Sequence, residues 1–392
     1  MLCKAHDMEP IGSLEGARNK SLTVTHNRPG SFSFTLDLEH EMAEYIWPLT
    51  SAVKLHRNRH ENFFVYDDIW SGYVTSVDED FASDKITVNC VGWLAFTERR
   101  KLRRDKVYTG NNPMTSEPWL DVEIIKDLID EMNTHPITWD NSYTFPKVWQ
   151  HPYLGYNATP LWWGSRAGDF STHQRPLKFD KDATFGSCIS TLIDMENGCD
   201  VWVDPATRLL HVNAVRGSVK SDVFFSFGTS QNNLARFSRQ GSSDELVTYF
   251  KATAPNRVPA YADTQLNPVP TQTPPEFGSN SMSVYGLLEE SESLSEAKTN
   301  EVLLAYAGAE LLFRSSLRPV YTMAPFPFTN DETYGWVPEP FVEYNVGDWV
   351  YLNAKHGKRL NVNKQRVRVF SMSVAWDDNG NETITDLQLT PQ

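Results

Sequence analysis

Cysteine is scarce in this chain and follows no recognisable pattern. The four residues, Cys3, Cys90, Cys188 and Cys199, include no C-x-x-C pair and no spacing typical of a zinc site. They are most simply free thiols in a reducing compartment. The sequence therefore predicts neither a disulfide framework nor a metal or other cofactor.

Long apolar runs are also absent. No stretch approaches the roughly 18 consecutive apolar residues of a membrane-spanning helix, and the N-terminal region lacks the apolar segment of a secretory signal. We expect a soluble protein that is made inside a cell and has no membrane span.

Positive charge is in deficit, since 36 Lys and Arg oppose 50 Asp and Glu. This balance argues against wrapping duplex DNA as the main role, because phosphate neutralisation requires cations. Residues 276–348 contain three basic and twelve acidic side chains, whereas 98–106 and 354–368 contain six cations each. Such segments are often simply solvated surface. Alternatively, faces of opposite charge meet across a subunit interface.

Catalytic motifs are missing as well. The sequence has no H-E-x-x-H, G-x-S-x-G, P-loop or G-x-G-x-x-G. Paired carboxylates could serve glycoside hydrolysis, but every such pair falls in a predicted turn, where aspartate is favoured for backbone reasons. We expect no enzyme; the pairs in question are Asp67 with Asp68, Asp78 with Asp80, and Asp377 with Asp378.

What is present suffices for several β-rich domains. The 392 residues are 40% hydrophobic, and up to about residue 100 short alternating segments predict a barrel or sandwich. Apolar stripes at 120–133 and 184–197 predict helices. Ser293–Glu296 fits the capping box of a third helix, and a proline-rich stretch at 255–275 predicts a linker.

Two hairpins, one near each end, hint at a duplication. Residues 72–77 precede an acidic turn and a second strand at 86–88, and residues 369–374 precede a similar turn and a strand at 384–387. Any two hairpins share this alternation, so the similarity alone is only suggestive. It predicts two similar barrels, with helical segments inserted between and within them.

Both ends of the chain resemble a known family. SLTVTHNRPGSFSFTLDL (21–38) and VYDDIWSGYVTSVDEDFASDKITVNCVGWLAFTERRKL (65–102) resemble the N-terminal barrel of phage tail-tip hub proteins, in particular minor tail proteins of siphophages that infect actinobacteria. The segment VGDWVYLNAKHG (346–357) and RVRVFSMSVAWDDNGNETITDLQL (366–389) resemble the closing barrel of the same family. The middle of the chain matches by architecture only.

The resemblance implies a β-rich α+β fold like that of a baseplate hub, with two tube-type antiparallel β-barrels and accessory mixed domains. We assign the first barrel to 1–100, an accessory α+β domain to 101–222, the second barrel to 223–252 with 320–392, and a Pro-rich linker with a helical insertion to 253–319.

The family also implies a structural virion protein, assembled in the host cytoplasm. Three copies would form a ring at the tail tip that closes the tail tube and guides DNA ejection. Its partners would be the distal tail protein, the tape measure protein, and other minor tail or fibre proteins. Phage DNA would pass transiently, since an acidic lumen offers it few binding minima. Many siphophage relatives carry a C-terminal enzyme or fibre module, which we do not expect after Gln392.

Two sets of residues are candidate contacts. The cationic segments supply candidate subunit or partner contacts at Arg99, Arg100, Arg103, Arg104, Lys355, Lys358, Arg359, Lys364 and Arg366. The aromatics Trp149, Trp162 and Trp163 could contact a partner or a glycan, although a core patch under a loop is the plainer interpretation. The alternative function is a tail-tip protein that binds cell-wall carbohydrate or degrades peptidoglycan.

Overall fold

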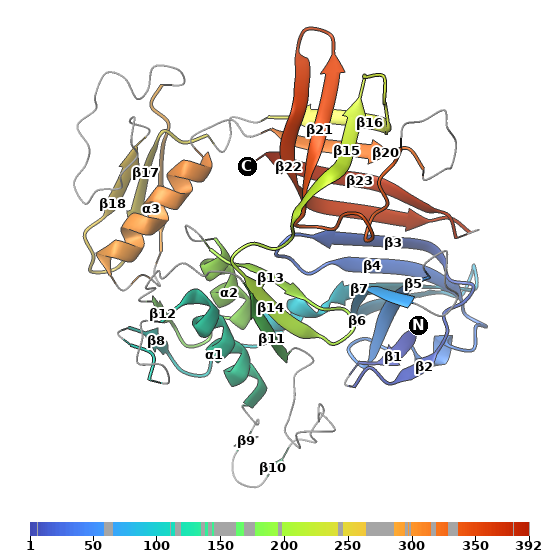
Figure 1. The fold of residues 1–392 in the computed structure, drawn as a ribbon. Helices are drawn as coiled ribbons and strands as arrows, with labels where there is room; N and C mark the ends of the chain where they lie inside the picture. The colour runs from blue at the N-terminus through green and yellow to red at the C-terminus, as the bar shows by residue number, and fades with distance from the viewer. Residues whose placement is uncertain are drawn as a thin grey trace.

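β-Strands are the predominant secondary structure of the computed structural model (Figure 1). The structure describes residues 1–5, 7–58, 66–109, 111–113, 119–134, 138–139, 143–144, 162–167, 177–194, 198–241, 246–263, 286–294, 297, 299–314, 319–327, 336–378 and 380–391. Within them, thirteen strands form one large sheet with strands from both ends of the chain. None of the described helices is long and apolar enough to cross a membrane.

The large sheet has two halves. The first half contains β1 (Leu2–Lys4), β2 (Pro10–Gly12), β3 (Arg18–Thr25), β4 (Ser31–Asp37), β5 (Ser51–Asn58), β6 (Tyr66–Asp80) and β7 (Lys85–Gly92). The second contains β15 (Val219–Phe227), β16 (Leu234–Gln240), β20 (Val320–Pro325), β21 (Trp349–His356), β22 (Leu360–Trp376) and β23 (Glu382–Pro391). The order is β16-β20-β23-β22-β3-β4-β7-β6-β5-β1-β2, and β21 pairs with both β22 and β15.

Alternation of apolar and polar residues is clear in β4 and β7. In β4, Phe32, Phe34 and Leu36 are buried, whereas the intervening side chains are exposed or half-buried. This is the period-two pattern of a sheet with one covered face. The two predicted hairpins are confirmed, since β6 pairs with β7 and β22 pairs with β23.

The expectation of two closed barrels is not confirmed. No closed barrel is present among the described residues; the sheet is open and ends at β16 and β2. The reason lies in β22, which is 17 residues long. Its first half pairs with β21 and its second half with β3, so the second set of strands continues into the first instead of curling back on itself.

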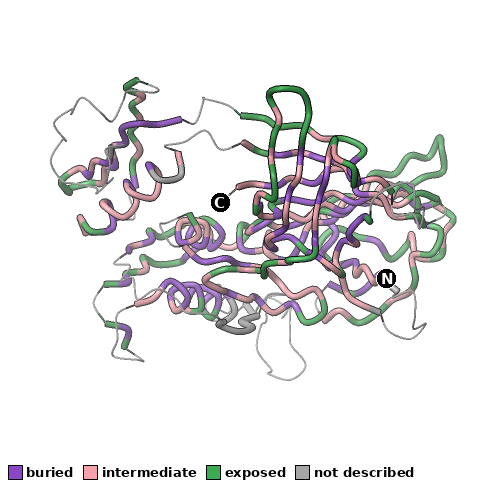
Figure 2. The backbone as a smooth tube through the Cα atoms, turned by 45° about the horizontal axis from the view of Figure 1, so that its top comes forward, coloured by how far each residue is buried: buried purple, intermediate pink, exposed green. Residues whose placement is uncertain are grey.

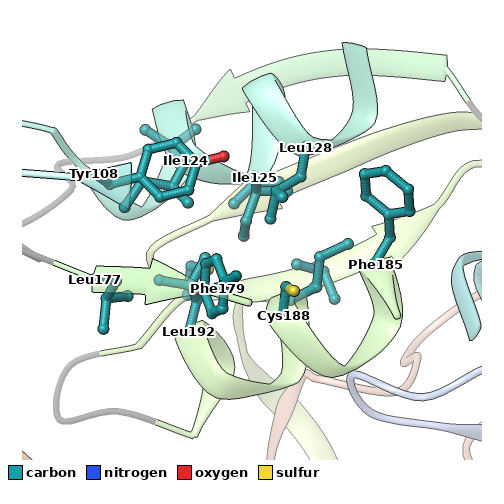
Figure 3. Packing of buried hydrophobic residues seen from close by; sticks show 14 of the residues in the cluster. Tyr108, Ile124, Ile125, Leu128, Leu177, Phe179, Phe185, Cys188 and Leu192 are labelled. Atoms are coloured by element: carbon teal, nitrogen blue, oxygen red, sulfur yellow. The ribbon is translucent and has the colours of Figure 1, made fainter. Parts of the chain in front are cut away.

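The segment between the halves forms a mixed unit beside the sheet. It contains a short 3-10 helix η2 (Trp93–Arg99), β8 (Lys106–Tyr108), α1 (Asp121–Thr134), β11 (Trp162–Ala167), β12 (Leu177–Phe179), α2 (Phe185–Ile193), β13 (Asp200–Val203) and β14 (Leu209–Asn213), with the short pair β9 (Thr138–Trp139) and β10 (Tyr143–Thr144). The apolar stripe of α1 faces α2 and β12 across a common core (Figure 3). Both helices lie where the sequence predicts them, and the Thr184 side chain caps α2 by accepting the Ser187 N–H.

A second insertion separates β16 from β20. The helix α3 (Asn300–Arg314) packs against a small sheet of β17 (Tyr249–Thr253), β18 (Ala260–Asp263) and β19 (Glu289–Ser293), at the upper left of Figure 1. Residues 223–252 were expected in the second barrel, but β17 pairs with β18 and β19 and not with β15 or β16.

The capping-box prediction at Ser293–Glu296 is wrong, because Ser293 ends a strand and the helix begins at Asn300. The strand forms there because β19 pairs with β17 along its length. Its Glu290 and Glu292 also ion-pair with Arg314 of α3. These tertiary contacts outweigh the local helix-start pattern.

A buried carboxylate fastens the mixed unit to the sheet. Asp200 Oδ1 lies 2.8 Å from His26 Nε2, just after β3, and its Oδ2 accepts the Arg216 N–H at 2.6 Å. Arg368 of β22 ion-pairs with the same carboxylate. Burial alone would raise the pKa of Asp200, but the hydrogen bond from His26 and the charges of His26 and Arg368 outweigh it and hold that pKa well below its ordinary value.

We expect Asp200→Asn to lower the free energy of unfolding by about 3 kcal/mol at pH 7, because the half-buried Arg368 guanidinium would keep its charge without its partner. A carboxyl with a lowered pKa contributes stability above its ordinary pKa and loses it as the pH falls toward the folded-state value. Urea unfolding at pH 7 and pH 3 should therefore show a smaller gap between wild type and variant at pH 3. The control Asp222→Asn changes an exposed carboxyl of β15, and an equal loss in both variants would contradict the assignment.

Candidate assembly interface

The two halves of the sheet repeat one five-stranded unit. Strands β3, β4, β5, β6 and β7 correspond to β16, β20, β21, β22 and β23, and the neighbour relations are the same in both halves. In the β6–β7 ladder the register slips between Val74 and Ser76. In the β22–β23 ladder it slips at the corresponding place, between Val369 and Ser371. A β-bulge at the same place in both copies indicates a true repeat, since alternation alone does not produce it.

Two further features support the repeat. The β5–β6 ladder slips directly after Leu55, and the β21–β22 ladder slips directly after Leu352. The burial patterns of β4 and β20 also agree position by position over six residues. The repeat ends at the next strand, because β1 runs antiparallel to β5 whereas β15 runs parallel to β21.

One ladder joins the two copies. Antiparallel pairing of β3 with β22 places Leu22 opposite Val374, and both are fully buried. On the other face, the hydroxyls of Thr23 and Ser373 lie 2.9 Å apart. The first half of the sheet therefore continues into the second through this ladder, which has one apolar face and one polar face.

The strand edges that correspond to this joint are open at the two ends of the repeat. Within the described residues, β16 pairs only with β20, and β6 beyond Val74 pairs only with β7. Residues 78–80 of β6 and 238–240 of β16 are exposed. The β6 edge has three acidic residues, Asp78–Asp80, whereas the β16 edge has two arginines, Arg236 and Arg239. The two open edges are opposite in charge.

One face of the joined sheet is rich in hydroxyl and amide groups. Paired positions place these side chains in rows from β6 across the joint to β16, and apart from the buried Ser371 they are half-buried or exposed. The opposite face is apolar and covers the core. The rows comprise Ser76, Thr87, Asn89, Ser31, Ser33, Thr35, Ser21, Thr23, Thr25, Ser371, Ser373, Gln388, Thr322 and Ser238.

The second predicted cationic segment forms a projecting hairpin. The turn between β21 and β22 reaches out at the top of Figure 1 and is exposed in Figure 2, with Lys355, Lys358 and Arg359 at its tip. Further down, Lys364 Nζ lies 5.5 Å from the Tyr351 ring centre and the Arg366 guanidinium 5.1 Å from that of Trp349. This segment presents cations to solvent.

The first cationic segment lies elsewhere in the fold, at η2 and beside α1, and most of its charges have contacts within the chain. Arg99 lies over the Tyr73 ring at 5.9 Å. Arg100 donates to the Met132 carbonyl at 3.0 Å, and burial lowers its pKa. Arg104 lies 3.9 Å from Glu131, while Arg103 is exposed.

The other candidate residues are placed as follows. Trp149 lies outside the described residues. Trp162 and Trp163 are in β11, which runs parallel to β14; their side chains also lie outside the description. Among the paired aspartates, Asp68 forms an ion pair with Lys54 at 2.7 Å. The turn prediction is wrong for Asp67, Asp68 and Asp78, which lie within β6 because that strand pairs with β5 and β7 there. Asp80, the last residue of β6, and Asp377 accept backbone N–H groups of the turns that follow them. No metal-holding group of three or more His, Cys, Asp or Glu occurs among the residues described.

The β16 edge was not among the sites predicted from the sequence. The hairpin duplication was the available signal, but it covered only β6–β7 and β22–β23. Extending it to β4 and β20 and then to β3 and β16 requires the pairing registers, which in the β16–β20 ladder link residues 80 or more positions apart.

We expect one repeat position to behave differently in the two copies. Leu22 is buried in the joint, whereas Arg239 occupies the corresponding position at the open edge. In dilute solution, where ultracentrifugation verifies a monomer, Leu22→Ala should cost about 3 kcal/mol of unfolding free energy. Arg239→Ala should cost within about 0.5 kcal/mol. Equal losses in urea unfolding would contradict the assignment of joint and edge.

Comparisons with known proteins find similarity at the level of fold. No protein-family model matches the sequence, and a search of curated proteins finds no relative. The tail protein from Neisseria meningitidis MC58 has a similar structure, with a TM-score of 0.57 at 10% identity, over 96% of this chain and 92% of that one. The 43 kDa tail protein of prophage MuSo2 from Shewanella oneidensis gives 0.55 at 11% identity, over 96% and 94%. A prophage tail protein from Listeria monocytogenes EGD-e gives 0.52 at 12% identity, over 100% and 94%. The chain has the fold of these tail proteins along nearly its whole length.

Proposed function

We propose that this chain is a structural virion protein, a hub that forms a homotrimeric ring at the tip of a phage tail. The observation that carries the proposal is the five-stranded repeat joined in register by the β3–β22 ladder. The fold shared with tail proteins supports the setting.

The repeat is suited to a ring with three-fold symmetry between chains and approximate six-fold symmetry between repeat units. Each chain contains two copies of the repeat unit side by side, so a ring of three chains contains six units. Such a ring presents six similar units to a hexameric tail tube and three identical chains to the tip components. The resemblance at both ends of the chain implies this role for hub proteins, here of a siphophage that infects actinobacteria.

The polar face suits the passage of DNA. If this face lines the ring, phosphates meet hydroxyl and amide groups and few cations, in a chain whose net charge is −14. Without concentrated positive charge, the path holds no strong binding minima for a polyanion. The ring would guide DNA during ejection without retaining it.

The projecting hairpin suits a protein partner. Lys355, Lys358 and Arg359 at its tip would contact an acidic surface across a boundary, either of the next subunit or of a neighbouring tail protein. By resemblance, the neighbours are the distal tail protein, the tape measure protein and other minor tail or fibre proteins. Arg99, Arg100, Arg103 and Arg104 remain secondary candidates. Assembly would take place in the host cytoplasm.

Native mass measurement and electron microscopy test the ring. The chain has a mass of 44.7 kDa, so three copies give about 134 kDa, and images should show a central hole. Template dependence is checked by adding tail tubes. Two or four copies, or a monomer even with tail tubes present, would contradict the proposal.

Reversing the hairpin charges tests the partner contact. The double variant Lys358→Glu, Arg359→Glu should slow assembly and weaken its dependence on salt, since opposite charges steer association. The double variant Lys181→Glu, Arg257→Glu, at two exposed positions outside the hairpin, makes the same change in net charge and serves as the control. Assembly at the wild-type rate and salt dependence would exclude the hairpin as a contact.

A further inference from the structure

We infer that the open edge of β6 in one copy pairs with the open edge of β16 in the next, so that the large sheet continues from copy to copy. The inference rests on the proposed ring and names the strands that close it. It follows from the repeat, the open edges and their charges.

The internal joint supplies the register. The β6–β22 correspondence, taken from the shared bulge, places Glu79 where β22 has Val374. The β3–β16 correspondence, taken through β4 and β20, places Arg239 where β3 has Leu22. Since Leu22 lies opposite Val374 within the chain, Glu79 of one copy would lie opposite Arg239 of the next.

The neighbouring positions match in chemistry. In this register Asp78 lies opposite Gln240, whose amide can donate to the carboxylate. Asp80 lies opposite Ser238, whose hydroxyl can donate likewise. These two pairs take the places of Thr23 with Ser373 and of Ser21 with Ala375 on the polar face. Each acidic residue of the β6 edge thus meets a donor or a cation.

The same register brings two aromatic rings together. Phe81, directly after β6, is 74% exposed and falls opposite Phe237. The Phe237 ring already stacks on Phe227 and on Tyr321, with ring centres 5.4 and 5.8 Å apart. Phe81 would extend this stack and lose its exposure to water.

A second copy of this chain fits these edges better than another partner. The two edges lie on one chain and are complementary to each other, which produces a head-to-tail contact that can close into a ring. Like edges repel, because two β6 edges would oppose carboxylates and two β16 edges would oppose guanidinium groups. Charged residues at both edges also keep the unassembled chain from uncontrolled strand pairing.

The difference between joint and edge has a physical reason. Leu22 and Val374 meet within the chain and are never exposed after folding, so an apolar pair is suitable there. Glu79 and Arg239 are exposed until two copies meet, so a charged pair keeps each edge soluble and selects the correct partner.

Cysteine cross-linking tests the register. Glu79→Cys and Arg239→Cys are made in separate chains, mixed, and oxidised; directly opposed strand residues lie within disulfide reach. A covalent dimer is expected in the mixture only, and the double variant in one chain should give covalent trimers on a non-reducing gel. All four native cysteines are buried. The matched control pairs Glu79→Cys with Ser238→Cys, one residue out of register and on the opposite face, and should cross-link far less.

Charge exchange provides an independent measurement. Glu79→Arg and Arg239→Glu should each weaken trimer association about tenfold or more, and the double exchange should restore most of it. Both positions are exposed, so each variant should keep the wild-type monomer stability, which is checked by thermal unfolding.

The outcomes separate the two proposals. In-register cross-links with rescue by the exchange support the paired edges. A normal trimer with neither cross-link nor charge effect overturns the edge pairing and leaves the ring proposal standing. Absence of any trimer, with tail tubes present, overturns both.

Discussion

The antiparallel ladder between β3 and β22 joins the two halves of the large sheet. It pairs residues about 350 positions apart in the chain. Both insertions therefore lie between its two strands in the sequence. Leu22 and Val374 bury its apolar side, and paired hydroxyls align its polar side. Because the ladder joins the halves edge to edge, the chain presents one continuous sheet and leaves the corresponding edges open at the ends of the repeat.

The buried carboxylate of Asp200 acts at the same place. His26 follows β3 directly and Arg368 lies in β22, so both strands of the joint contribute to the group that binds Asp200. Asp200 itself begins β13 of the mixed unit. The backbone N–H of His26 also donates to the backbone carbonyl of Phe370 in β22, at 2.8 Å. The mixed unit is therefore positioned by the joint, and its orientation depends on a charge that is costly to leave unpaired.

Repeat and edge together connect the fold to the proposed ring. A duplicated unit that pairs with itself in the chain already contains the geometry of a contact between units. What changes at the open edges is the chemistry, from Leu22 and Val374 to Arg239 and Glu79, while the backbone positions correspond. The hydroxyl-rich face runs across the joint without interruption. In a ring, the same face would continue from copy to copy.

The local elements can be predicted from the sequence alone. The alternation of Phe32, Phe34 and Leu36 predicts β4, the two hairpins are correctly located, and apolar stripes predict α1 and α2, because burial of one face imposes a period on a short segment. Resemblance at the two ends pointed to tail hubs, and the shared fold agrees. The pairing in three dimensions was needed to show that the halves join instead of closing into barrels, that β17 belongs to the insertion, and that Glu79 and Arg239 occupy matching edges. These depend on pairing registers between distant strands, and no local pattern in the chain encodes a register.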